Sequence, residues 1–298
     1  MTIPTNFRPM LACDYRKVIT KPASVLYSEK LNGIRCVFFG GVAYSRTLKR
    51  MPNEEIQKIA IEHKYGMEGC DTEIISGDKY AVDVLHKSDS FCMTKNKIDS
   101  FTINIFDVYD PNLNWFDRTD KIKQLIENGC YPEHVRFLEH IPSSEIDLEV
   151  YKNKILNMGG EGVVIRNPYS TYKSGRSGIH NPELQKVKSY FDDEFMVVGY
   201  TQLETNKNEA FLNEVGYTKR STSKIGKSKV EALGSIIVTK EGTCFSVGSG
   251  FTFEERIMLW KIRDTLLGKY AKIKYTSYSY KNVPLQPIFI CFRNKIDM

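Results

Sequence analysis

Apolar residues in the first two thirds of the chain occur in short runs bounded by polar and turn-forming residues. Such runs are typical of β-strands. They predict strands over residues 25–27, 36–39, 69–75, 101–109, 163–165 and 183–188. This region therefore contains several strands, most of them too short to be helices.

Three longer stretches between these runs have helical periodicity. The first follows Asn53, a residue type that commonly caps a helix N-terminus, and covers residues 53–60. The others are predicted over 120–128 and 144–158, and each is followed by a glycine that can end a helix, Gly129 and Gly159. Strands and helices together predict a mixed α+β region.

The pattern changes after Tyr190. Short strand-like stretches occupy residues 195–200, 235–238, 244–247, 270–275 and 287–292. One helix is predicted between the third and fourth, because Thr252 and Glu255 have capping-box spacing and Gly268 can end it. Five strands and one helix predict a small closed barrel of the OB type. We expect two domains, residues 1–189 and 190–298.

Composition restricts the class of protein. The chain has 298 residues, 41% of them hydrophobic, and no apolar run of membrane-spanning length. Residues 1–11 lack a basic segment followed by an apolar one, which argues against secretion. The seven cysteines form no C-x-x-C pair, so neither a zinc site nor a disulfide framework is indicated. We expect an intracellular protein that is not bound to a membrane.

The formal net charge is +6, and part of it is concentrated in one segment. Residues 217–229 contain Lys219, Arg220, Lys224, Lys227 and Lys229 and no acidic residue. A solvated loop and an arm that follows a phosphate backbone both fit this segment.

Lys30 lies in a short turn between two predicted strands, together with Gly33 and Arg35. A lysine with the usual pKa near 10.4 is a poor nucleophile at pH 7 unless neighbouring cations or burial lower that pKa. On this segment alone, an ordinary loop lysine is the better interpretation.

Other polar residues also stand at the ends of predicted strands. Glu161 lies among glycines that leave room for a ligand, and Glu73 could accept hydrogen bonds from a ribose. Phe106 could stack on a nucleobase, and Lys186 and Lys188 share one strand face. Each has an ordinary explanation, as a turn glutamate, a core phenylalanine or an exposed strand face. Together with Lys30 they suit attack of an amine on the α-phosphate of a nucleotide.

In the order of these residues, the chain resembles the covalent nucleotidyltransferases, which comprise ATP-dependent DNA ligases, RNA ligases and capping enzymes. The family's nucleophile motif K-x-D-G-x-R is similar to residues 30–35, with Asn32 in place of the aspartate. Five further elements are similar in order and spacing: Ser45-Arg46-Thr47, Asp71-Thr72-Glu73-Ile74, Phe106-Asp107, Glu161-Gly162-Val163-Val164-Ile165-Arg166 and Lys186-Val187-Lys188. In the second of these, Thr72 replaces the glycine of the family's D-G-E-I element. The resemblance implies a nucleotidyltransferase domain followed by an OB-fold domain.

Within this family the chain most resembles the minimal viral DNA ligases. Residues 172–177 and 216–222 both look like segments of those enzymes. In them the second segment belongs to an insertion, here at about 201–233, that forms a β-hairpin latch around duplex DNA. The resemblance therefore favours a DNA-clamping role for the basic segment.

The resemblance also implies roles for individual residues. Lys30 would attack ATP and carry AMP before AMP passes to the 5′-phosphate of nicked duplex DNA. Arg293 matches the family's basic C-terminal element loosely and would assist the first step. The other implied roles are ribose binding by Glu73, adenine stacking by Phe106, binding of Mg²⁺ or Mn²⁺ by Glu161, nucleotide or nick phosphate binding by Arg35, Arg46, Arg176, Lys186 and Lys188, and DNA binding by Lys219, Arg220, Lys224 and Lys227. We expect a monomer.

Two alternatives stay open at this level. An RNA ligase or a capping-type nucleotidyltransferase shares the motifs, and a non-catalytic relative that only binds nucleic acid is suggested by Asn32. An NAD-dependent ligase is disfavoured, because 29 residues before Lys30 are too few for its nicotinamide-recognition domain.

Overall fold

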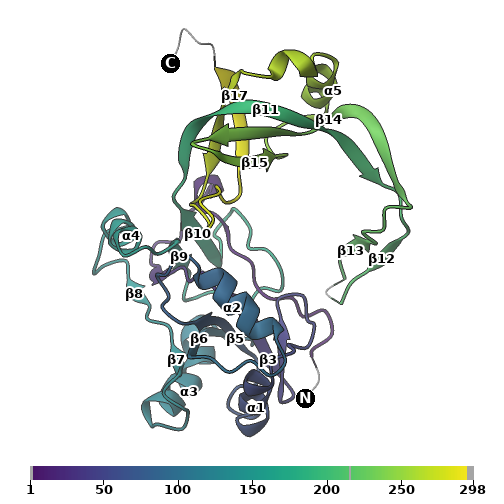
Figure 1. Ribbon diagram of the computed structural model, residues 1–298. Helices are drawn as coiled ribbons and strands as arrows, with labels where there is room; N and C mark the ends of the chain where they lie inside the picture. The colour runs from purple at the N-terminus through teal and green to yellow at the C-terminus, as the bar shows by residue number, and fades with distance from the viewer. Residues whose placement is uncertain (1–2, 215, 294–298) are drawn as a thin grey trace. The chain divides into compact units, whose positions relative to one another are not determined.

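The computed structural model describes residues 3–214 and 216–293, and Figure 1 shows the order of the elements along the chain. Contacts divide the described residues into two compact units. The first runs to Lys188 and includes Glu214 and Gly216, and the second holds Ser189 to Asn213 and the residues from Tyr217 onwards. None of the described helices is long and apolar enough to span a membrane.

The first unit contains two five-stranded sheets. One has the order β1-β10-β9-β2-β8 and is built from Cys13–Asp14, Leu184–Lys188, Gly162–Arg166, Leu26–Glu29 and Ile141–Pro142. A short 3₁₀ helix, Tyr15–Lys17, follows β1. The sheet is antiparallel except for the β1–β10 pair.

The other sheet has the order β4-β3-β5-β6-β7, built from Val42–Ser45, Ile34–Phe39, Cys70–Ser76, Phe101–Val108 and Val135–Phe137. All six strands predicted for this part of the chain are confirmed across the two sheets. The strands that the sequence did not predict, β1, β4, β7 and β8, have two to four residues each.

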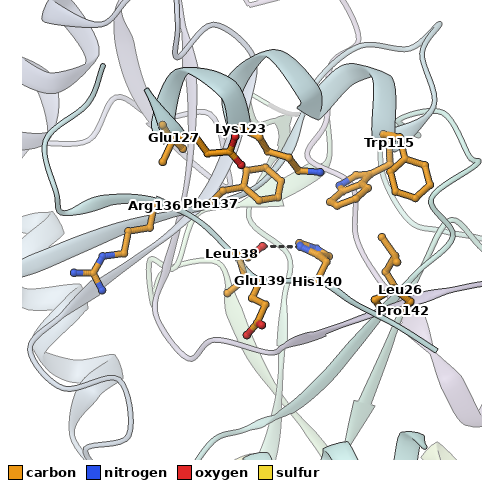
Figure 2. Close-up of a pocket in the computed structure, with 12 residues that line it drawn as sticks. Leu26, Trp115, Lys123, Glu127, Arg136, Phe137, Leu138, Glu139, His140 and Pro142 are labelled. Atoms are coloured by element: carbon orange, nitrogen blue, oxygen red, sulfur yellow. Dashed lines mark hydrogen bonds between the residues drawn. The ribbon is translucent and has the colours of Figure 1, made fainter. Parts of the chain in front are cut away.

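Two predicted helices of the first unit are displaced from their expected starts. Helix α3 (Trp115–Glu127) begins five residues before the predicted position 120, because the Asn114 side chain caps it by accepting a hydrogen bond from the Asp117 backbone. Helix α4 (Leu148–Asn157) begins after the predicted position 144, because the side chain of Asp147 caps the helix immediately before Leu148. Trp115 and Lys123 of α3 pack against Phe137 and His140 (Figure 2).

The other two helices differ in how well the sequence predicted them. Helix α1 (Glu54–Glu62) is confirmed, and Asn53 caps it through a bond from the Ile56 backbone. Helix α2 (Val84–Met93) was not predicted. Asp83 at its N-terminus makes no capping bond through its side chain, so the usual sequence signal is weak there.

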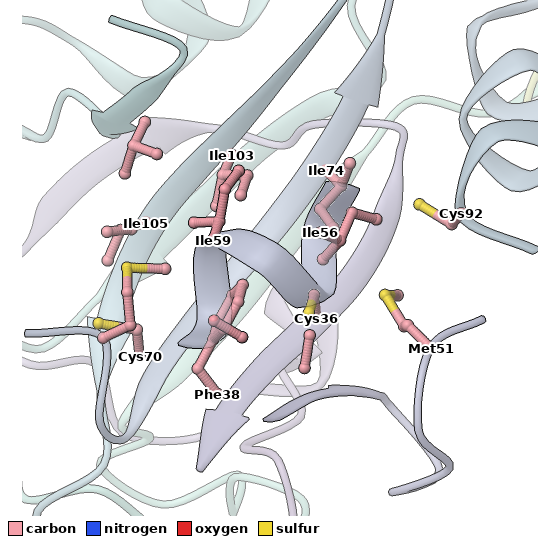
Figure 3. Close-up of a cluster of buried hydrophobic side chains, with 14 of the residues drawn as sticks. Cys36, Phe38, Met51, Ile56, Ile59, Cys70, Ile74, Cys92, Ile103 and Ile105 are labelled. Carbon is pink, nitrogen blue, oxygen red and sulfur yellow. The ribbon is translucent and has the colours of Figure 1, made fainter. Parts of the chain in front are cut away.

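The largest core of the first unit lies between α1 and the β3-β5-β6 face (Figure 3). Ile56 and Ile59 of α1 pack against Cys36, Ile74 and Ile103 of the strands. Burial of a side chain of this size contributes about 1.5–3 kcal/mol to folding. This core holds the sheet that carries Arg35, Glu73 and Phe106.

The second unit is built on a five-stranded sheet of order β15-β14-β11-β16-β17. Its strands are Thr243–Val247, Lys227–Lys240, Phe191–Asn206, Tyr270–Tyr275 and Ile288–Arg293, which confirms all five predicted strands. The strand order does not by itself form the fully closed barrel that was predicted. Among the described residues, β15 and β17 end the order, and a bridge between Ser249 and Ile288 links the segment after β15 to β17.

Helix α5 (Phe253–Lys261) has the predicted capping box between Thr252 and Glu255. It ends earlier than Gly268 suggested, because a 3₁₀ helix, Arg263–Leu266, takes over after Ile262. The core of this unit gathers apolar side chains of the sheet, among them Phe195, Leu233 and Ile273.

A long β-hairpin extends from this sheet. Strands β11 and β14 stay paired as far as Asn206 and Lys227 (Figure 1), although the register shifts on the way. Beyond them β12 (Ala210–Leu212) pairs with β13 (Thr218–Arg220). The hairpin occupies the region where the sequence predicted an insertion.

Candidate active site

Residues 30–33 form the link between the two sheets of the first unit, since β2 belongs to one sheet and β3 to the other. The backbone N–H of Lys30 donates to the Gly162 carbonyl at 2.9 Å, and that of Gly33 donates to the Glu73 carboxylate at 3.1 Å. A Cβ at Gly33 would lie 2.3 Å from the Ile74 carbonyl oxygen. Glycine is therefore required for this loop to pass so close to β5.

The amine of Lys30 forms an ion pair with Oε2 of Glu161. Lys188 binds the other carboxylate oxygen, Oε1, at 2.5 Å. Burial favours a higher pKa for Glu161, but the two lysines outweigh it and the pKa lies below its ordinary value. The carboxylate is therefore ionised and neutralises two cations at one place.

A cavity of about 230 Å³ opens beside Lys30. It brings together seven of the residues that the sequence singled out: Lys30, Arg35, Arg46, Glu73, Phe106, Arg176 and Lys186. Apolar side chains complete its walls, including Leu31, Leu138 and Val164. Residues from both sheets thus converge on one small pocket that carries more positive than negative charge.

One wall of the cavity is cationic. Burial lowers the pKa of Lys186, and the nearby charges of Lys188, Arg176 and Lys30 lower it further. Arg176 also donates to the Ala12 carbonyl at 3.1 Å. Mutual repulsion of this kind favours binding of an anion, and a polyphosphate is the natural candidate.

Glu73 provides the acidic side of the cavity. Burial raises the pKa of Glu73 to about 7, although Lys30 and Arg35 act in the opposite direction. A half-buried carboxylate with spare acceptor capacity suits hydroxyl donors such as those of a sugar.

Arg35 is held by a network that the sequence did not predict. Its guanidinium donates twice to Asp71, at 2.8 and 2.5 Å, and the Tyr172 hydroxyl donates to the same carboxylate at 2.6 Å. The guanidinium also lies 5.4 Å from the centroid of the Phe106 ring. Asp71 and Tyr172 therefore fix an arginine in the cavity wall.

A second buried ion-pair network lies behind Phe106 and joins Asp107 to Arg118 and Arg166. Asp107 and Arg166 lie in motifs that resemble those of the family, but the sequence predicted no role for either residue. Arg118 was not predicted as a functional residue at all. The available signal was the pattern of α3, where Arg118 occupies the face that also carries Trp115, Thr119 and Ile122. A charged residue on the buried face of a helix needs a buried partner.

The remaining predicted site residues belong to the second unit. Lys219 and Arg220 lie on β13, and all four predicted DNA-binding residues, with Lys224 and Lys227, are exposed. Arg293 ends β17 and donates to Glu194 at 2.9 Å. The four exposed cations are available to an external anion, whereas Arg293 is partly buried and ion-paired.

The structure gives a sparse donor set for a metal. Within residues 3–214 and 216–293, no three His, Cys, Asp or Glu side chains gather as a metal site would require. The Glu161 carboxylate is the acidic group next to Lys30, and both its oxygens bind lysines.

Comparison with known proteins points to one family. Residues 226–293 match the family described as DNA ligase OB-like domain. A DNA ligase of Haemophilus influenzae is 25% identical over 237 residues, which cover 77% of this chain and 74% of that protein.

Two solved structures resemble the chain over nearly its whole length. A structure of Chlorella virus DNA ligase-adenylate is 27% identical, with a TM-score of 0.52 and coverage of 98% of this chain and 99% of the other. A structure of a Lig E DNA ligase has a TM-score of 0.71 at 20% identity and covers 96% of this chain and 99% of its own. These findings confirm the predicted resemblance to DNA ligases and the predicted α+β fold with an OB-like domain.

Proposed function

We propose that this chain is an ATP-dependent DNA ligase that joins a 3′-hydroxyl to a 5′-phosphate at a nick in duplex DNA. The observation that carries the proposal is the position of the Lys30 amine. It lies beside a cavity that also holds an acidic acceptor, Glu73, an aromatic ring, Phe106, and the cationic side chains of Arg46 and Lys186. These are the groups that a nucleoside triphosphate requires.

In the first step the Lys30 nitrogen attacks the α-phosphorus of ATP. A P–N bond forms, the P–O bond to the β-phosphate breaks, and pyrophosphate leaves with the electron pair, while the Lys30 ammonium group loses two of its three protons to solvent and keeps one N–H in the phosphoramidate. Arg46, Lys186 and Lys188 stabilise the charge of the phosphates, and Glu73 and Phe106 hold the ribose and the adenine. Catalysis of this kind rests on positioning and charge neutralisation.

Two further transfers complete the reaction. A 5′-phosphate oxygen of the nick attacks the lysyl-AMP, so that the P–N bond breaks and a pyrophosphate linkage forms. The 3′-hydroxyl then attacks the 5′-phosphorus, a phosphodiester forms and AMP leaves. Arg35 and Arg176, which line the same cavity, are suited to hold the phosphates during these steps.

Glu161 is the residue that would hold Mg²⁺ or Mn²⁺. Such ions commonly bind through one carboxylate together with phosphate oxygens and water, so a single acidic group is compatible with them. When bound, the ion supplies further neutralisation of the polyphosphate charge.

DNA binding is assigned to the second unit and its hairpin. Lys219, Arg220, Lys224 and Lys227 are exposed, and their charge suits a phosphate backbone. Residues 1–189 would act as the nucleotidyltransferase domain and 190–298 as the OB domain, with Arg293 assisting the first step. We propose that the enzyme acts as a monomer.

The decisive experiment is incubation with α-labelled ATP and Mg²⁺, followed by a chase onto nicked duplex. Wild-type protein should acquire label, Lys30→Ala should not, and nicked DNA should discharge the label and be sealed. No covalent label, or label retained in Lys30→Ala, would refute the lysyl-AMP step. Preferential sealing of nicked RNA would favour an RNA ligase instead.

A further inference from the structure

Phe106 lies at a β-bulge. Along the β5–β6 pair, Asp71 lies opposite Asp107 and Thr72 lies opposite Ile105, so Phe106 has no partner residue on β5. A bulge bends its strand and redirects a side chain, and it leaves backbone groups to be satisfied elsewhere. Here the Phe106 carbonyl oxygen accepts a hydrogen bond from the Trp115 indole nitrogen at 3.1 Å.

The next residue, Asp107, is held by the same helix. Arg118 donates to Oδ1 through Nε at 2.7 Å and to Oδ2 through Nη2 at 3.2 Å, and Arg166 also donates to Oδ2, at 2.5 Å. The three side chains are at most 2% exposed. Burial favours a higher pKa for Asp107, but the two arginines hold it below its ordinary value. The bulge is thus fixed at two successive residues.

Trp115 itself has little freedom to move, because it is 1% exposed and surrounded by other rings (Figure 2). The His140 ring lies 4.6 Å from it and Phe137 5.9 Å, and the Lys123 amine lies 4.1 Å from its ring. Burial lowers the pKa of His140 to about 3, so this neighbour stays uncharged at neutral pH. The indole N–H is therefore held toward β6.

We propose that Trp115 and Arg118 are positioning residues for nucleotide binding, and that helix α3 sets the position of the Phe106 ring through the bulge. Neither residue is among those that line the cavity, whereas Phe106 and Arg166 are. This inference rests on the proposed function, since it takes Phe106 as the ring that stacks on the base. It assigns to α3 a part in base binding and none in phosphate binding.

Trp115→Phe tests the proposal, because it keeps an aromatic ring and removes the N–H. The ATP concentration that gives half-maximal lysyl-AMP formation should rise about fivefold, as expected for loss of one hydrogen bond. The maximal single-turnover rate should stay within twofold. Inhibition by inorganic tripolyphosphate, which has no base, should be unchanged.

Phe116→Leu is the matched control, since Phe116 is the neighbouring aromatic residue of α3 and is 41% exposed. It should behave as wild type. In a Phe106→Ala background, Trp115→Phe should have no further effect on the half-saturating ATP concentration, because the ring that it positions is absent.

Three results would overturn the inference: an unchanged half-saturating ATP concentration, an equal loss of tripolyphosphate binding, or additivity with Phe106→Ala. If Trp115→Phe does not fold, Trp115→3-benzothienylalanine removes the same N–H in a ring of nearly the same shape, and the same readouts apply. Absence of label in the wild-type protein would instead count against the proposed function.

Discussion

Lys30 and Lys188 bind opposite oxygens of a single carboxylate, that of Glu161. The candidate nucleophile is therefore held as one half of an ion pair. A polyphosphate that enters the cavity offers both lysines alternative anionic partners. Removal of the carboxylate should thus affect the first chemical step more than the fold.

We expect Glu161→Gln to slow lysyl-AMP formation by about 100-fold, the size typical for loss of one electrostatic group in an active site. Single-turnover labelling with α-labelled ATP measures this rate. Glu133→Gln, an exposed carboxylate of the same unit, is the control and should label as wild type does. A rate within twofold of wild type in Glu161→Gln would remove Glu161 from the proposed machinery.

Gly33→Ala should destabilise the protein by about 1–3 kcal/mol, as overpacking of a tight site usually does. The added Cβ would lie 2.3 Å from the Ile74 carbonyl oxygen, and the loop that carries Lys30 must move to avoid it. Denaturant unfolding measures the stability, and labelling should fall as well.

The control for this change is Gly178→Ala, where the nearest atom to a new Cβ is 3.7 Å away. It should unfold and label like the wild-type protein. Equal behaviour of the two variants would show that the loop tolerates a side chain at position 33.

The affinity for ATP should increase as the pH rises from 6 to 8. Burial raises the pKa of Glu73 to about 7, so the carboxyl is mostly protonated at pH 6 and mostly ionised at pH 8. The ionised form accepts ribose hydroxyls better. Binding of the unreactive analogue α,β-methylene-ATP to the protein with Lys30 intact measures this dependence, and Glu73→Gln should flatten it.

The same shift affects the stability of the ligand-free protein. A carboxyl whose folded pKa is raised binds its proton more tightly in the folded state, so stability is lost as the pH rises from about 4.5 through about 7. Glu73→Gln should therefore be more stable than wild type at pH 8 and closer to it at pH 5. Equal stability differences at both pH values would contradict the raised pKa.

The sequence predicted those parts of the molecule that depend on neighbouring residues in the chain. The strands that carry Glu73, Phe106 and Lys186 follow from local apolar patterns, and Asn53 marks the start of α1 correctly. The networks that hold these residues could not be predicted, because they join distant segments. Arg118 has a role only once Asp107 lies opposite it, and the bulge at Phe106 appears only when β5 and β6 are paired.

The exposed cations of the hairpin give a further prediction. Replacement of Lys219, Arg220, Lys224 and Lys227 by alanine should weaken binding to nicked duplex DNA. If each side chain neutralises one phosphate, the slope of log affinity against log salt should become shallower by about 3–4. Titration of labelled nicked DNA at several salt concentrations measures both effects.

Self-adenylylation should stay unchanged in that hairpin variant, because these four residues belong to a different compact unit from the Lys30 cavity. The control replaces four exposed lysines of the first unit, Lys58, Lys64, Lys121 and Lys154, with alanine, which changes the net charge equally. It should retain most of the affinity and the salt dependence. Equal loss of binding in both variants would mean that total charge, and not the hairpin, governs DNA binding. A parallel fall in self-adenylylation would contradict the assignment of these residues to DNA.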